Sequence, residues 1–140
     1  TIDPYMIYQA RTLGASAILL ICSLLSQSEL EEYQAIATEL GMSALVEAHD
    51  EQEVEMALRA EASIIGVNNR DLKTFTVDIN NSARYRKMVP KEVSFVSESG
   101  IKTAEDIAKL LENGTDAVLI GETLMRSENK KQALDELRGM

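Results

Sequence analysis

The sequence predicts an α/β fold, more specifically a partial (β/α)8 barrel of the TIM type, with about five βα units preceded by one helix. Short apolar segments rich in Ile, Val and Leu alternate with longer amphipathic segments, which is the pattern of parallel strands covered by helices on both faces. A flat five-stranded sheet would also satisfy the strand count, but the sequence contains neither a Gly-rich dinucleotide loop nor a Walker loop.

Capping residues mark where the predicted helices begin. Asp3 can cap a helix whose first position is Pro4. The Ser26–Glu29 segment is a capping box, and Asp50 and Glu53 have the same spacing. In chain order we expect a helix from Asp3 to Leu13, a strand over Ala17–Cys22, a helix from Ser26 to Leu40, a strand ending near Glu47, a helix from Asp50 to about Ala60, a strand ending at Asn68 and Asn69, a helix from Asn80 to Met88, a strand ending at Glu98, an amphipathic helix, a strand ending at Gly121 and Glu122, and a last helix from about Asn129 to Leu137.

The number of strands indicates that the barrel is incomplete. A full barrel of this type has eight strands and about 250 residues, whereas this chain has 140 residues. The chain also starts with a helix, so we expect that it begins where a longer protein has been cut. We therefore expect residues 1–140 to form one domain, the carboxyl-terminal portion of a barrel without its first strands. Such a domain has two exposed sheet edges, which pair with the missing segment or with another copy.

The composition disfavours several classes of partner. A formal charge of −9 argues against nucleic acid, whose binding depends on Lys and Arg. A phosphate ligand would therefore depend on backbone N–H groups or on local cations. The longest apolar run, Ala15 to Leu25, is too short to span a membrane, and from the polar start of the sequence we expect no signal peptide. The single Cys22 fits the reducing cytoplasm and is expected to be a small core residue.

Polar residues at the ends of the predicted strands are candidates for catalysis, because enzymes with this barrel place catalytic groups there. Glu47 follows the apolar run Ala44–Val46, so burial should raise the pKa of its carboxyl group and suit it to proton transfer. Alternatively, Glu47 is paired with a Lys or Arg. Asn68 either binds substrate or turns the chain. The Glu98–Ser99 pair ends a later strand in the same way.

Arg70 and His49 also have structural alternatives. Arg70 offers a bidentate fork for a carboxylate, or it pairs with Asp71 or Asp78. His49 is the only histidine and stands beside Asp50 at a helix cap, so we expect it to be structural rather than catalytic. With one histidine and one cysteine, we expect no transition-metal site.

The segment from Ser94 to Met125 indicates a phosphate ligand. It contains two successive strand–helix units, and the loops after the last two strands of such barrels often bind phosphate. Gly100 and Gly121 permit close approach of the backbone to an anion, or they serve tight turns. The turn that starts at Glu122 offers backbone N–H groups to an anion. We expect the carboxylate of Glu122 itself to point away from the anion.

Four motifs together resemble one known family. LVEAHDE, IIGVNNRDLKTF, VSESGIKT and VLIGETLMR occur in this order, after the opening segments IDPYMIYQAR and AILLI. They are similar to the corresponding part of indole-3-glycerol phosphate synthase, and the resemblance covers essentially the whole chain. The Asn-Asn-Arg-Asp-Leu and Ser-Glu-Ser-Gly-Ile motifs are specific at this spacing, although each alone would be weak.

The resemblance implies a (β/α)8-barrel lyase of tryptophan biosynthesis that needs no metal or organic cofactor. Members of this family close the pyrrole ring of a carboxyphenylamino-deoxyribulose phosphate and release carbon dioxide and water. By motif, Glu47 and Asn68 match catalytic residues, and Arg70 is a candidate for binding the substrate carboxylate. The other positions that match substrate-binding or phosphate-binding residues are Glu98, Ser99, Gly100, Gly121 and Glu122.

The resemblance also implies that part of the active site is missing. The family's general-acid lysine and an earlier essential glutamate and lysine would precede Thr1. We therefore expect the isolated chain to be inactive, since general acid catalysis contributes about 10²–10⁴-fold. Glu61 and Thr115 replace the family's usual Gly and Ala at connections remote from the catalytic face. Two alternatives stay open: a non-catalytic phosphate-binding or assembly module, and another phosphate-binding barrel enzyme such as phosphoribosylanthranilate isomerase or a ribulose-phosphate epimerase.

Overall fold

The computed structural model describes residues 1–71 and 74–139, and these contain a parallel sheet of five strands in the order β1-β2-β3-β4-β5. Each strand lies beside the strand that precedes it in the sequence, as the predicted succession of βα units requires. The strands are β1 (Ala17–Ile21), β2 (Ser43–Ala48), β3 (Ile64–Asn68), β4 (Ser94–Glu98) and β5 (Ala117–Leu119).

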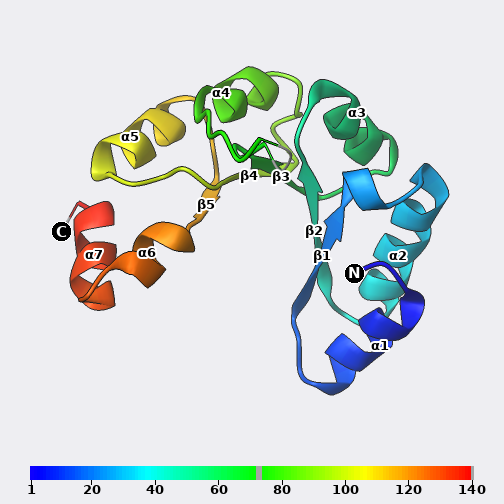
Figure 1. The fold of residues 1–140 in the computed structure, drawn as a ribbon. Coiled ribbons are helices and arrows are strands. Elements are labelled where there is room, and N and C mark those ends of the chain that lie inside the picture. Colours follow the sequence, from blue (N-terminus) through cyan, green and yellow to red (C-terminus); the bar gives the residue numbers. More distant parts are fainter. Residues whose placement is uncertain (72–73, 140) are drawn as a thin grey trace.

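The helices surround the strands on the outside of an arc (Figure 1). In Figure 1 the arc runs from α1 and α2 through α3 and α4 to α5, and the chain ends in α6 and α7. This curved arrangement is part of a (β/α) barrel, as predicted. The helices in the described residues are α1 (Pro4–Thr12), the 3-10 turn η1 (Cys22–Leu24), α2 (Gln27–Glu39), α3 (Glu51–Arg59), α4 (Asn80–Arg86), α5 (Ala104–Glu112), α6 (Glu122–Arg126) and α7 (Lys130–Leu137). None of them is long and apolar enough to cross a membrane.

Side-chain caps account for the starts of α2 and α3. The capping box predicted for Ser26 and Glu29 forms in both directions. Asp50 accepts a hydrogen bond from the backbone N–H of Glu53 at 2.9 Å. The carboxylate of Glu53, however, accepts from the backbone N–H of His49 at 2.8 Å. The second predicted box is therefore only half formed, and Glu53 is drawn toward the end of β2.

Two element ends differ slightly from the prediction. Strand β1 ends at Ile21, and Cys22 begins η1. Cys22 is buried, and burial raises the pKa of its thiol to about 12, so its expected place in the core is confirmed. Helix α4 ends at Arg86 rather than Met88, because the backbone hydrogen bonds change to the i−3 type in the turn before Pro90.

The last strand, β5, is only three residues long. Its pairing with β4 ends at Glu98 and Leu119. Pairing stops there because Ser99 has a φ of 65° and turns the chain out of the sheet. Gly121 consequently caps the short helix α6. The prediction that this strand reaches Gly121 is wrong by two residues.

The hydrophobic core supports the first four strands far better than the last. One cluster of buried hydrophobic residues starts at Ile7 in α1 and ends at Phe95 in β4. It includes residues of α1, α2, α3 and α4, so these helices pack against the sheet. Among the described residues after Phe95, the buried hydrophobic ones are Ile101, Leu110 and Leu137.

Strands β1 and β5 form the two edges of the sheet in the described part of the chain. Within these residues β1 pairs with β2 alone, and β5 pairs with β4 alone. Leu19 on β1 and Leu119 on β5 are partly exposed, at 37% and 47%. The two predicted open edges are therefore present.

Candidate active site

The ends of three adjacent strands bring Glu47, Asn68 and Glu98 together. In the parallel register Glu47 lies beside Gly66, and Asn68 lies beside Glu98, so the three side chains share one face of the sheet. Their exposed fractions are only 6%, 9% and 4%. Nδ2 of Asn68 donates a hydrogen bond to Oε1 of Glu47 at 3.1 Å. We refer to Glu47, His49, Asn68 and Glu98 as the carboxylate site.

Glu98 occupies space that only a glycine can leave open. A Cβ atom at Gly66 would lie 1.9 Å from Oε1 of Glu98, far inside van der Waals contact. The same Oε1 atom is buried without a hydrogen-bond partner among the described residues. An unpaired buried oxygen disfavours the ionised carboxylate. The sequence pointed to Glu98 but not to Gly66, because their contact depends on the register between β3 and β4.

His49 connects Glu47 to the start of α3. Its Nδ1 atom hydrogen-bonds with Oε2 of Glu53 at 3.1 Å. Its Nε2 atom lies 3.1 Å from Oε1 of Glu47, an ion-pair distance, although the direction is not that of a hydrogen bond. The sequence predicted a structural rather than catalytic residue at a helix cap, and it gave no expectation of the contact between His49 and Glu47. The missed signal was the spacing of two from Glu47, which keeps both residues on one face of an extended chain.

The titratable groups of the carboxylate site differ strongly in pKa. Burial disfavours charge on Glu47, but the contact with His49 and the hydrogen bond from Asn68 outweigh it, so the pKa of Glu47 is lowered from 4.5. Burial and the charge of Glu47 raise the pKa of Glu98 to about 7. Contact with Glu47 and Glu53 raises the pKa of His49 to about 10. The prediction of a raised pKa for Glu47 is therefore wrong, and the raised carboxyl pKa belongs to Glu98.

A second buried network joins the end of β3 to α4 and β4. Nδ2 of Asn69 donates to Oγ of Ser97 at 3.0 Å and to the carbonyl oxygen of Ser99 at 3.1 Å. Oγ of Ser82 donates to Oδ1 of Asn69 at 2.9 Å and lies 2.7 Å from Oγ of Ser97. This network holds the carbonyl group of Ser99, where the chain leaves the sheet. Sequence analysis missed it because its members are distant along the chain.

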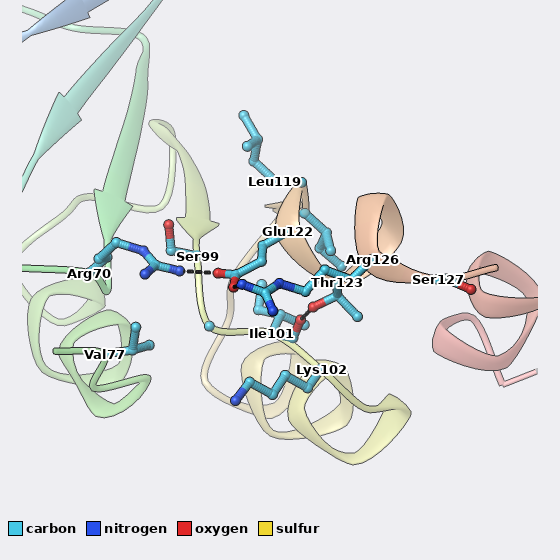
Figure 2. Close-up of a pocket in the computed structure, with 13 residues that line it drawn as sticks. Arg70, Val77, Ser99, Ile101, Lys102, Leu119, Glu122, Thr123, Arg126 and Ser127 are labelled. Atoms are coloured by element: carbon cyan, nitrogen blue, oxygen red, sulfur yellow. Dashed lines mark hydrogen bonds and ion pairs between the residues drawn. The ribbon is translucent and has the colours of Figure 1, made fainter. Parts of the chain in front are cut away.

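A pocket of about 780 Å³ lies beside the carboxylate site, at the loops that follow β4 and β5 (Figure 2). Gly100 has a φ of 79°, and a Cβ atom there would lie 2.3 Å from Cγ1 of Val77, so this position requires glycine. Oγ1 of Thr123 donates to the carbonyl oxygen of Ile101 at 2.7 Å, which ties α6 to the loop after β4. Because the sequence predicts a phosphate ligand at these loops, we refer to this space as the anion pocket. Its polar and glycine lining residues include Arg70, Ser99, Gly100, Lys102, Gly121, Glu122 and Arg126.

Arg70 reaches across the anion pocket to α6 (Figure 2). Its Nη2 atom pairs with one carboxylate oxygen of Glu122, and the other oxygen lies 3.0 Å from Nη2 of Arg126. Hydrogen bonding with Arg70 lowers the pKa of Glu122. The sequence suggested Asp71 or Asp78 as partners of Arg70, whereas the structure pairs it with Glu122. The Glu122 carboxylate therefore extends toward Arg70 instead of pointing away from the pocket.

The fold and these two sites together define the class of protein. Buried polar groups at the carboxyl ends of parallel strands, beside a pocket made by the last two strand–helix loops, are the arrangement of a (β/α)-barrel enzyme. Within residues 1–71 and 74–139, no cluster of His, Cys, Asp and Glu side chains could hold a metal ion. Leu72, which completes the Asn-Asn-Arg-Asp-Leu motif, lies outside the described residues.

Solved structures agree on this fold. 3-Hexulose-6-phosphate synthase is similar with a TM-score of 0.80, 17% identity, and coverage of 99% of this chain and 69% of that chain. The tryptophan synthase complex of Pyrococcus furiosus gives a TM-score of 0.74, 16% identity, and coverage of 98% and 61%. At such identities the similarity shows the fold alone.

Sequence comparison shows the family. The family model of indole-3-glycerol phosphate synthase matches residues 1–137. The indole-3-glycerol phosphate synthase of Ruminiclostridium cellulolyticum is 60% identical over 99% of this chain and 54% of its own length. That of Leuconostoc mesenteroides is 52% identical over 99% and 53%. The chain therefore belongs to the indole-3-glycerol phosphate synthase family, and it spans about half the length of the curated relatives it matches.

Proposed function

We propose that this chain supplies the carboxyl-terminal part of an indole-3-glycerol phosphate synthase, a carboxy-lyase of tryptophan biosynthesis. The substrate would be a carboxyphenylamino-deoxyribulose phosphate, which closes its pyrrole ring with loss of carbon dioxide and water. The observation that carries the proposal is the convergence of Glu47, Asn68 and Glu98 next to the anion pocket, in a chain of this family. The single cysteine, buried as a free thiol, fits a cytoplasmic location.

Glu47 has the properties of a general base. Ring closure and loss of water require that a proton leaves the substrate and that an oxygen of the substrate gains one. The lowered pKa keeps Glu47 ionised at neutral pH, and Asn68 orients its Oε1 atom. Glu47 accepts the proton in this proposal, and Asn68 positions it.

Glu98 has the complementary properties. With a pKa of about 7, the Glu98 carboxyl group keeps its proton in a large fraction of the molecules at neutral pH. Neighbouring carboxyl groups whose environments separate their pKa values are a recurring arrangement for base and acid. Glu98 therefore donates a hydrogen bond to a substrate oxygen, while the family's general-acid lysine would come from outside this chain.

The anion pocket would hold the phosphate group. The chain as a whole carries a charge of −9, so the attraction has to be local. A Cβ atom at Gly121 would meet nothing within 4 Å, which leaves the backbone there accessible to a ligand. Lys102 and Arg126 add positive charge to the lining. Arg70 would exchange the Glu122 carboxylate for that of the substrate.

We further propose that the edges of β1 and β5 pair with the remaining strands of the barrel. Both edges are open in the described residues, and Leu19 and Leu119 are partly exposed on them. The matched relatives are about twice as long as the aligned region, which is enough for the missing strands. The alternative is that two copies of this chain associate through the same edges. Native mass in solution distinguishes a monomer from such a dimer.

An assay of a chimeric protein tests the catalytic proposal. The chain would be joined to the amino-terminal half of the Ruminiclostridium cellulolyticum relative, to which it is 60% identical. The chimera should form indole-3-glycerol phosphate, and the isolated chain should not. Glu47→Gln should lower kcat by about 10²–10⁴-fold, whereas Glu55→Gln, at a half-exposed side chain of α3, should have no effect. A folded but inactive chimera, beside an active full-length relative, would support the non-catalytic phosphate-binding or assembly module instead.

A further inference from the structure

His49 stands between two carboxylates. Its Nε2 atom lies 3.1 Å from Oε1 of Glu47, and its Nδ1 atom lies 3.1 Å from Oε2 of Glu53. The side chains of all three residues are at least four-fifths buried, with exposed fractions of 15%, 7% and 18%. A neutral imidazole has one donor nitrogen and one acceptor nitrogen. Because a carboxylate oxygen lies 3.1 Å from each nitrogen, the doubly protonated ring, which carries a positive charge, fits both neighbours better than the neutral ring.

The position of Glu53 is set by the first turn of α3. Its backbone N–H donates to Oδ1 of Asp50 at 2.9 Å, and its Oε2 atom accepts from the backbone N–H of His49 at 2.8 Å. Negative charge is favoured at the start of a helix. Glu53 is thus held in place on one side of the ring, and the other ring nitrogen lies beside Glu47.

The imidazolium makes the two buried carboxyl groups unequal. Glu47 and Glu98 share one buried site, and like charges disfavour ionisation of both. His49 contacts Glu47 directly, so its charge stabilises the carboxylate form of Glu47. We propose that His49 is a positioning residue of the reaction: anchored by Glu53, it keeps Glu47 oriented and ionised as the base and leaves the shared proton on Glu98. This inference rests on the proposed function of Glu47.

The groups around His49 determine the direction of the pH effect. Acidic groups predominate, which favours the cationic ring. Removing its charge removes the contact that most lowers the pKa of Glu47, so this pKa should rise. The titratable and charged groups that face the site from the surrounding described residues are Cys22, Glu47, Asp50, Glu53, Arg70, Asp71 and Glu98.

NMR titration of this chain measures the charge of His49 directly, because the chain contains a single histidine. The ring should stay doubly protonated at about pH 8, well above the ordinary midpoint of about 6.5. Glu53→Gln should lower the midpoint because it removes one of the two carboxylates. Glu55→Gln, in the same helix but half-exposed, is the matched control and should leave the midpoint unchanged. A neutral ring at about pH 8 in the folded chain would overturn the proposal without any assay of activity.

Kinetics of the chimera test the effect on the reaction. His49→Gln keeps a hydrogen-bond donor without the charge, so kcat should fall by about tenfold or more while KM changes by less than about twofold. The acidic limb of the kcat–pH profile should move to higher pH, because Glu47 then binds its proton more tightly. His49→Lys restores a positive charge and should recover part of the lost rate.

A purely structural histidine would give a different pattern. His49→Gln would then lower the Tm while kcat and the pH profile of the folded chimera stay unchanged, and this result would refute the proposal. If the unmodified chimera is inactive, the proposed function fails and the catalytic role of His49 fails with it. The NMR titration separates the two failures, because it reports the charge of His49 in either case.

Discussion

The carboxylate site and the anion pocket adjoin at the end of β4, yet they are built in different ways. In the carboxylate site, Glu47 and Glu98 are less than a tenth exposed and depend on side-chain neighbours. In the anion pocket, the Glu122 and Arg126 side chains are 50% and 80% exposed, and the backbone turn at Gly100 provides the shape. Reactive groups need a desolvated environment to divide their pKa values, whereas an anion can be bound by backbone conformation and exposed cations.

The packing beneath the two sites differs accordingly. The core cluster from Ile7 to Phe95 lies under the strands that carry the carboxylate site. The anion pocket is bordered by β5, which has three residues, and by α6, which has no buried residue. We therefore expect residues 1–98 to contain most of the stability of the chain, and residues 99–139 to depend on further contacts.

The largest expected effect separates the two regions by their packing. Leu20→Ala removes a fully buried side chain of β1 and should lower the free energy of unfolding by about 2–5 kcal/mol. Leu111→Ala, at a position 72% exposed in α5, should change it by less than about 0.5 kcal/mol. Urea unfolding followed by circular dichroism measures both. A similar loss in Leu111→Ala would mean that this side chain of α5 is packed far more tightly than its exposure indicates.

The next effect separates the two sites by their response to pH. The folded chain binds the Glu98 proton more tightly than the unfolded chain does, with a pKa of about 7 against 4.5. This contribution to stability is present below about pH 4.5 and is lost as the pH rises to about 7. The loss should be at most about 3 kcal/mol, and it should be absent from Glu98→Gln. Glu122→Gln, in the exposed anion pocket, should keep the wild-type dependence of stability on pH in this range. Denaturation curves at several pH values measure this dependence, and its loss in Glu122→Gln would contradict the assignment to Glu98.

Two glycine substitutions compare the sites directly. Gly66→Ala places a Cβ atom 1.9 Å from Oε1 of Glu98 and should destabilise the chain by about 1–3 kcal/mol. Gly121→Ala meets nothing within 4 Å and should cost less than about 0.5 kcal/mol. It should instead weaken binding of inorganic phosphate. Tm values measure the change in stability, and phosphate titrations measure the change in binding. A large loss of stability in Gly121→Ala would contradict a pocket that is open at this glycine.

The smallest effect should not distinguish the two regions. Glu61 follows α3 with a φ of 54°, a position that is occupied by glycines at the ends of α1, α2 and α5. Glu61→Gly should stabilise the chain by about 1 kcal/mol, because glycine adopts positive φ without strain. Gly114→Ala, at the end of α5, should cost a similar amount. Tm shifts of opposite sign are expected, and equal signs would contradict the explanation.

Features that depend on residues close together along the chain could be predicted from the sequence. The βα order follows from alternating apolar and amphipathic segments, and the capping box at Ser26 follows from a spacing of three residues. The strand-end positions of Glu47 and Asn68 follow from where apolar runs stop. The catalytic roles proposed for both residues come from motifs that this half-length chain still contains.

Features that depend on register between strands could not be predicted in this way. Burial alone suggested a raised pKa for Glu47, but His49 and Asn68 reverse the shift, and Asn68 comes from another strand. Likewise, no local pattern joins Arg70 to Glu122, because the two residues meet only when β5 lies beside β4. The sequence therefore predicted the candidate residues at the strand ends but placed the raised pKa on the wrong carboxyl group.

The contact between Gly66 and Glu98 has a consequence for natural variation. The two positions lie on neighbouring strands, and the Glu98 side chain fills the space that a side chain at position 66 would occupy. In an alignment of homologous chains, they should therefore covary: a residue larger than glycine at position 66 should accompany a side chain shorter than glutamate at position 98. Lineages that keep the glutamate should keep the glycine as well, even though the glycine itself carries no reactive group.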